Sequence, residues 1–272
     1  MNLPLLLEPE NLHSKPLDER LLIVDLCSLG DYRTAHVPHA IHINTADLLV
    51  DTKPVIGRLP AAEQLSALFS KIGLKPDTHL VCYDDEGGSW AGRFIWILDS
   101  VGHKNYSFLN GGKTAWIAGG LPMQSGENSP HAQRVSLDVS RAYSVNCDEI
   151  LAHLNDRDFL VWDVRSRDEY TGVAARSARG GHIPGAVWCE WTDLLDKTRG
   201  LRLRTDLAGF LGAHGITADK NIVTHCQTHR RSGVSYIAAK SLSYPRIRAY
   251  DGSWSEWGNR DDLPVTVGEN PQ

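Results

Sequence analysis

A cysteine stands beside two histidines and two arginines in the stretch HCQTHRRS, residues 225–232. The β-branched residues IVT precede it and the helix-like sequence GVSYIAAK follows, so Cys226 lies where a strand ends and a helix begins. There a thiol faces unpaired backbone N–H groups and the positive end of the helix dipole, which favour the thiolate. Arg230, Arg231 and the histidines add positive potential. We therefore predict that Cys226 is a nucleophile with a lowered pKa, in a loop that binds an anion.

Two enzyme chemistries use a thiolate in this setting, phosphatase and sulfurtransferase. A phosphatase loop has five residues between its cysteine and its arginine. Here only four residues separate Cys226 from Arg231, and Ser232 stands where that arginine would be. The ring of amides is one residue short, which suits a single sulfur atom better than a tetrahedral phosphate. Metal binding by Cys226, His225 and His229 is disfavoured, since three ligands within five residues leave little room for tetrahedral geometry. We expect neither a metal nor a cofactor.

The chain contains an internal repeat, which predicts two homologous domains. The matching segments are 21–43 with 159–191, 73–102 with 215–243, and 109–122 with 250–264. They occur in the same order with nearly constant offset. We predict an N-terminal domain at 1–125, a linker at 126–142 that is rich in Gly, Ser, Pro and Asn, and a C-terminal domain at 143–272.

Within each half, short apolar runs alternate with helix-like stretches. LLIV, HLVCY and NIVTH have the length and composition of strands, whereas AAEQLSALFSKIG and SWAGRFIWILDSVG have helical spacing and end at glycine. This alternation predicts the α/β class, with a small, mainly parallel sheet flanked by helices in each domain. In such sheets, sites lie beyond the carboxyl ends of the strands, where the cysteine loop falls.

Composition excludes several classes of protein. The 272 residues are 42% hydrophobic and carry a net charge of −5, so nucleic acid and anionic membranes are not expected partners. No apolar run approaches the roughly 20 residues of a membrane span. The N-terminal sequence lacks the basic region and cleavage site of a signal peptide. Five scattered cysteines without CxxC spacing argue against disulfides and for a reducing, cytoplasmic compartment.

Four motifs give the sequence a family resemblance. They are DVRSRDEY at 163–170, GHIPGA at 181–186, the cysteine loop, and YDGSWSEW at 250–257. In type and order they resemble a tandem-domain rhodanese of bacterial type, a thiosulfate:cyanide sulfurtransferase. The resemblance implies that Cys226 takes the outer sulfur of thiosulfate as a persulfide and passes it to cyanide or a thiol. It leaves open a sulfur carrier that delivers to a partner protein, and a 3-mercaptopyruvate sulfurtransferase.

The resemblance also assigns roles to other residues. The expected substrate-binding residues are Gln227, Thr228, His229, Arg230, Arg231 and Ser232, with Trp191 and Arg165 as further candidates. For Arg165 we favour an ion pair with Asp163, and for Trp191 a place in the core. His182 is expected to serve folding, and Asp251 to cap a helix near the loop. Asp84 aligns with Cys226 in the repeat, and a carboxylate cannot take up sulfane sulfur, so the N-terminal domain is expected to be catalytically inactive.

Overall fold

The computed structural model describes residues 3–16, 18–53 and 55–269. These residues form two compact units, and each unit includes one short segment from the half of the sequence that otherwise forms the other unit. The first unit contains the described residues up to Leu48, together with Pro60–Ser140 and Leu195–Leu203. The second contains Leu49–Leu59, Arg141–Leu194 and the described residues from Arg204 onward. Each unit therefore includes a short piece of the other half of the chain.

The first unit is built on a parallel sheet, which has five strands among the described residues, in the order β1-β7-β6-β2-β3. The strands are β1 (Leu6–Leu7), β2 (Leu21–Asp25), β3 (Ile41–His42), β6 (His79–Tyr83) and β7 (Tyr106–Leu109). The helices are α1 (Pro9–His13), α2 (Leu29–Thr34), α3 (Ala62–Lys71), α4 (Ser89–Ser100) and α5 (Gly112–Ala118), with 3-10 turns at Thr45–Leu48 and Lys197–Arg199. An antiparallel pair, β10 (Leu195–Asp196) and β11 (Arg202–Leu203), completes it.

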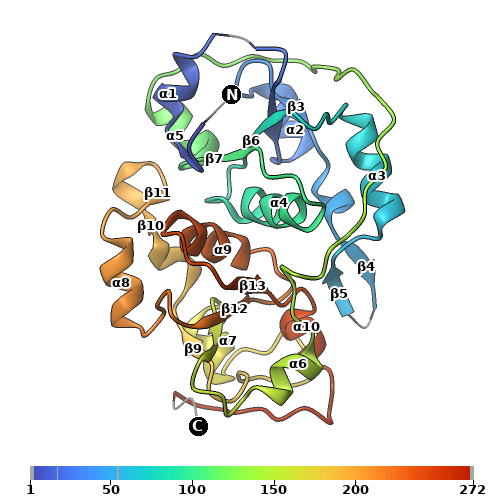
Figure 1. Cartoon of the computed structure of the whole chain (residues 1–272). Helices are drawn as coiled ribbons and strands as arrows, with labels where there is room; N and C mark the ends of the chain where they lie inside the picture. The colour runs from blue at the N-terminus through green and yellow to red at the C-terminus, as the bar shows by residue number, and fades with distance from the viewer. Residues whose placement is uncertain (1–2, 17, 54, 270–272) are drawn as a thin grey trace. The chain divides into compact units, whose positions relative to one another are not determined.

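The second unit repeats this plan with a parallel sheet in the order β13-β12-β8-β9, four strands in the part of the chain that the structure describes. The strands are β8 (Phe159–Asp163), β9 (Val187–Trp188), β12 (Asn221–His225) and β13 (Ile247–Ala249). The helices are α6 (Cys147–Ala152), α7 (Arg167–Thr171), α8 (Leu207–Ala213), α9 (Ser232–Ser241) and α10 (Ser253–Trp257), with a 3-10 turn at Trp191–Leu194. The antiparallel pair β4 (Val50–Thr52) and β5 (Val55–Arg58) belongs to this unit, and β5 contacts α10 (Figure 1).

The central strands are apolar because both of their faces are covered. All five residues of β6 are buried, as are the last four of β12. A parallel strand covered on both sides loses the polar–apolar alternation of a half-exposed strand. Helices run alongside both sheets, α4 beside β6 and β7, and α9 beside β12 and β13 (Figure 1). The expected α/β class, with mainly parallel sheets flanked by helices, is confirmed.

The two sheets place the repeat in matching register. Asp25 at the end of β2 pairs with Tyr83 at the end of β6, and Asp163 at the end of β8 pairs with His225 at the end of β12. The next residue along the chain is Asp84 in the first unit and Cys226 in the second. These two residues therefore occupy equivalent positions, one step beyond the carboxyl end of a central strand.

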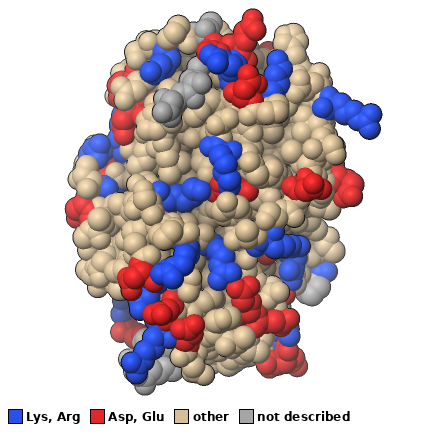
Figure 2. Space-filling model, in the orientation of Figure 1, with Lys and Arg blue, Asp and Glu red and all other residues tan. Residues whose placement is uncertain are grey.

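The face of the molecule in Figure 2 shows no large area of one charge. On the face shown in Figure 2, basic and acidic side chains of the described residues are interspersed. None of the helices in the described residues is long and apolar enough to cross a membrane.

Candidate active site

Cys226 directly follows β12, and the loop from Cys226 to Arg231 leads into α9. The side chain of Cys226 is buried, with only 1% of the residue exposed. The loop needs unusual backbone geometry, since His229 has a positive φ of 53°. The ring of His229 stabilises this turn, because its Nδ1 lies 2.7 Å from the hydroxyl of Ser232 at the start of α9.

Helix α10 holds the loop from the other side. The amide of Trp254 donates to the carbonyl oxygen of Cys226 at 3.0 Å, and the amide of Ser255 donates to that of Gln227 at 2.9 Å. These bonds use N–H groups from the first turn of α10, which have no partner within their own helix. Gly252 precedes α10 as its N-cap residue. The expectation that Asp251 caps this helix is wrong, because its carboxylate accepts the amide of Leu59 instead, at 2.8 Å.

The surroundings of Cys226 favour the thiolate. Burial raises the pKa of its thiol, but the charge of Arg231, the hydroxyl of Ser232 and the amides of Ser232 and Thr228 lower it, and the net pKa lies below the usual value. In the other four cysteines burial raises the pKa, to about 11 in Cys147 and about 12 in Cys189. Cys226 therefore differs from every other thiol of the chain in the direction of its shift.

Arg231 is fixed by a carboxylate that the sequence did not identify. Its two terminal nitrogens donate to the two oxygens of Glu169, at 2.7 and 2.9 Å. Burial raises the pKa of Glu169, but Arg231 and the hydroxyl of Ser166 lower it, so Glu169 is ionised near neutral pH. Ser166 and Glu169 also form the capping box at the start of α7. The S-x-x-E spacing of these two residues could have predicted that Glu169 lies in the first turn of a helix. It could not have predicted the bond to Arg231.

Arg165 makes a buried ion pair, the interpretation favoured from the sequence. Its guanidinium group donates to both oxygens of Asp163, with Nε at 2.9 Å from Oδ1, and to the carbonyl oxygen of Gly181 at 2.7 Å. It also lies over the ring of Trp254, 4.2 Å from the centroid. Arg165 thus links the end of β8, the GHIPGA segment and α10. A direct role in substrate binding stays a prediction.

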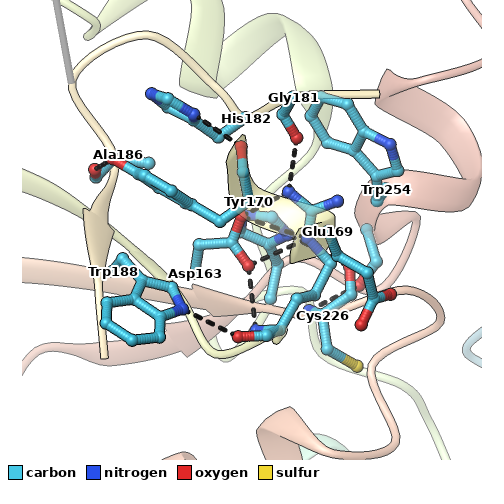
Figure 3. Close-up of polar contacts among 12 residues, drawn as sticks. Asp163, Glu169, Tyr170, Gly181, His182, Ala186, Trp188, Cys226 and Trp254 are labelled. Atoms are coloured by element: carbon cyan, nitrogen blue, oxygen red, sulfur yellow. Dashed lines mark hydrogen bonds and ion pairs between the residues drawn. The ribbon is translucent and has the colours of Figure 1, made fainter. Parts of the chain in front are cut away.

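His225 contributes less charge than expected. Burial lowers the pKa of His225, whose Nε2 lies 3.6 Å from the carboxylate of Asp163, so His225 is neutral near pH 7. His182 stacks on Tyr170 with centroids 3.7 Å apart, and its Nδ1 lies 2.9 Å from the carbonyl oxygen of Tyr170 (Figure 3). Among the described residues no cluster of three or more His, Cys, Asp or Glu side chains could hold a metal ion.

Three more of the predicted residues lie within the loop, and Trp191 lies outside it. Gln227 donates to the hydroxyl of Ser177 at 3.1 Å and is partly buried, as are Thr228 and Arg230. Trp191 begins the 3-10 turn after β9 and is partly buried, and its amide donates to the carbonyl oxygen of Val164 at 3.2 Å. Of the predicted residues, Thr228, Arg231 and Ser232 are the ones that lower the pKa of the Cys226 thiol.

The equivalent loop of the first unit holds a carboxylate of its own. Asp84 is buried, and its two oxygens accept four backbone amides, those of Glu86 and Gly88 on Oδ1 and those of Trp90 and Ala91 on Oδ2. All four distances are 2.8 or 2.9 Å. A ring of amides around the start of a helix is an anion site, and here a side chain of the protein fills it.

Fold and site together define a two-unit α/β protein in which one unit carries an activated cysteine and the other an aspartate at the same position. The family model described as Rhodanese-like domain matches residues 8–119 and 146–260. The chain therefore belongs to the rhodanese family. It is 46% identical over 266 residues to a thiosulfate sulfurtransferase of Azotobacter vinelandii and 44% identical to one of Pseudomonas aeruginosa, covering 98% of both chains in each comparison. Its fold is similar to that of the crystal structure of YnjE, with a TM-score of 0.86 at 23% identity, covering 98% of this chain and 69% of that one.

Proposed function

We propose that the chain transfers sulfane sulfur from thiosulfate to a thiophilic acceptor through a persulfide on Cys226. It is an enzyme, a thiosulfate sulfurtransferase. The observation that carries this proposal is the lowered pKa of a buried thiol, set among loop amides, Ser232 and Arg231. The names of the relatives that are 46% and 44% identical support thiosulfate as the donor.

The reaction proceeds in two displacement steps. The Cys226 thiolate attacks the outer sulfur of thiosulfate, a bond forms between the two sulfur atoms, and the bond within thiosulfate breaks. Its electron pair leaves with sulfite, so the enzyme holds an anionic persulfide. Cyanide or a thiolate then attacks the terminal sulfur, which leaves as thiocyanate or a new persulfide and restores the Cys226 thiolate. This is the ping-pong scheme of covalent catalysis.

The residues around the thiol have separate tasks in this scheme. The amides of Thr228 and Ser232 and the hydroxyl of Ser232 stabilise negative charge on the Cys226 sulfur, before and after it gains the second sulfur atom. Arg231 attracts the dianionic donor, and Glu169 holds its guanidinium in place. Arg230, Gln227, His229, Trp191 and Arg165 remain candidates for donor binding around this centre.

We assign the chemistry to the C-terminal domain, at 143–272, joined through the linker at 126–142 to a catalytically inactive N-terminal domain at 1–125. The inactivity rests on Asp84, which has no sulfur to load and whose carboxylate occupies the amides that an anionic donor would need. We place the enzyme in the cytoplasm, because its five cysteines are all free and its chemistry requires a reduced thiol.

Sulfur uptake tests the proposal directly. Thiosulfate should add one sulfur atom to the intact mass of the wild-type chain, and cyanide should remove it with release of thiocyanate. Cys226→Ser should stay folded and take up no sulfur, while Cys189→Ser, a matched control in the same unit, should load normally. Loading of Cys226→Ser at the wild-type rate would overturn the proposal. Faster loading from 3-mercaptopyruvate than from thiosulfate would show that thiosulfate is not the preferred donor, and the persulfide part of the proposal would stand.

A further inference from the structure

A hairpin from the N-terminal half of the sequence belongs to the catalytic unit. Strands β4 and β5 lie within Leu49–Leu59, which the structure groups with the second unit. The hairpin is attached to α10 and to Asp251, two residues before that helix begins, by contacts of three kinds. The amide of Leu59 donates to Asp251 at 2.8 Å, the hydroxyl of Ser255 donates to the carbonyl oxygen of Ile56 at 2.7 Å, and Arg58 forms an ion pair with the buried Glu256.

These attachments converge on the same helix that holds the cysteine loop. Ser255 joins the two, because its amide donates to the carbonyl oxygen of Gln227 and its hydroxyl donates to that of Ile56. One residue of α10 therefore fixes the hairpin and the loop to each other.

Gly57 of the hairpin packs directly against the backbone of Thr228 in the cysteine loop. Gly57 has a φ of +100°, and a Cβ atom added there would lie 2.5 Å from the carbonyl oxygen of Thr228 and 2.8 Å from its Cβ. Real Cβ atoms do not approach a peptide that closely, so any side chain at this position would push Thr228. The hairpin backbone thus rests on the residue whose amide faces the Cys226 sulfur.

We propose that Gly57 is a positioning residue of the active site, and that the hairpin holds the peptide of Thr228 so that its amide points at the Cys226 sulfur. This inference rests on the proposed function, since it concerns the same thiol. It makes the N-terminal half of the sequence a contributor to catalysis through one short segment, although the thiol itself is in the C-terminal half. A division of the chain at the linker would separate the hairpin from its loop.

Gly57→Ala tests this proposal against Gly215→Ala. Gly215 lies in the same unit with a φ of +73° and nothing within 4 Å of an added Cβ, so its variant carries the backbone strain without the clash. Two quantities are measured, the rate of sulfur loading in a single turnover and the pH at which the Cys226 thiolate forms. The thiolate is followed by its ultraviolet absorbance, with Cys226→Ser as the blank. We expect Gly57→Ala to load about 10- to 100-fold more slowly and to ionise at higher pH, with Gly215→Ala unchanged in both.

A second pair of variants decides the question if Gly57→Ala does not fold. Asp251→Ala removes the acceptor of the Leu59 amide, whereas Asp251→Asn keeps a carbonyl oxygen there. We expect slower loading and a higher ionisation pH in Asp251→Ala and near-normal behaviour in Asp251→Asn. Equal loading and equal ionisation in Gly57→Ala and Gly215→Ala, or in the two Asp251 variants, would overturn the inference. Failure of the wild type to take up sulfur would refute the proposed function alone, because the thiolate titration still compares the variants.

Discussion

Replacing Asp84 with alanine should destabilise the first unit by about 2–4 kcal/mol. The carboxylate of Asp84 accepts four amides, of which those of Gly88 and Ala91 are fully buried. A buried donor that loses its acceptor costs about 1–3 kcal/mol, whereas the amides of Glu86 and Trp90, whose bonds are only partly buried, can turn to water. Burial raises the pKa of Asp84 although the four amides oppose that rise, so removing the carboxylate also relieves a desolvation cost. The net loss is therefore smaller than the lost bonds alone suggest.

Hydrogen exchange over α4 measures this loss locally, because α4 begins beside the four amides. Exchange of the amides in α4 should accelerate in Asp84→Ala. Asp85→Ala is the matched control, since Asp85 accepts none of these four amides, and its exchange should match the wild type. Formate supplies a carboxylate without the methylene group, so it should restore protection in Asp84→Ala. Chloride at equal ionic strength should not.

Two results would refute this reasoning. Unchanged exchange in Asp84→Ala would mean that the four amides are satisfied without a carboxylate. Failure of both formate and chloride to restore protection would mean that the vacated site does not bind an anion. Either result would remove the physical reason given for the inactivity of the N-terminal domain, namely that its anion site is already filled.

Three further predictions concern the catalytic loop. Arg231→Gln should raise the pKa of Cys226 and shift the acid limb of the loading rate to higher pH, because the thiolate loses a favourable charge; an unshifted profile would contradict this. Glu169→Gln should lower the free energy of unfolding in urea by about 1.5–3 kcal/mol, since one of two charge-assisted bonds to Arg231 is lost, and a change below 0.5 kcal/mol would show that the pair is not needed. The wild type should not hydrolyse aryl phosphates, because the loop is one residue too short for phosphate; efficient phosphate release in a colorimetric assay would contradict the loop argument.

Local sequence determined the class of fold and singled out Cys226 as the proposed nucleophile. The alternation of apolar runs with helix-like stretches predicts parallel sheets because the burial of a strand on both faces leaves a continuous apolar segment. The place of Cys226 after such a run and before a helix predicts a thiol among free amides, whatever the rest of the chain does. The repeat then identified Asp84 as its counterpart, and the matching strand registers agree with that alignment.

Tertiary structure alone decided what surrounds the thiol. Glu169 and Arg231 are 62 positions apart, and Ile56 and Ser255 are 199 apart. No periodicity or cap signal connects residues at such separations, since local patterns report only the periods of helices and strands. The sequence also predicted that Asp251 caps a helix. In the folded chain its carboxylate accepts the amide of Leu59 instead, because a buried carboxylate pairs with the donor that packing places next to it. Cys226 was therefore predictable as the candidate nucleophile, whereas the contacts of its loop with Glu169 and with the β4–β5 hairpin were not, because they form only through folding.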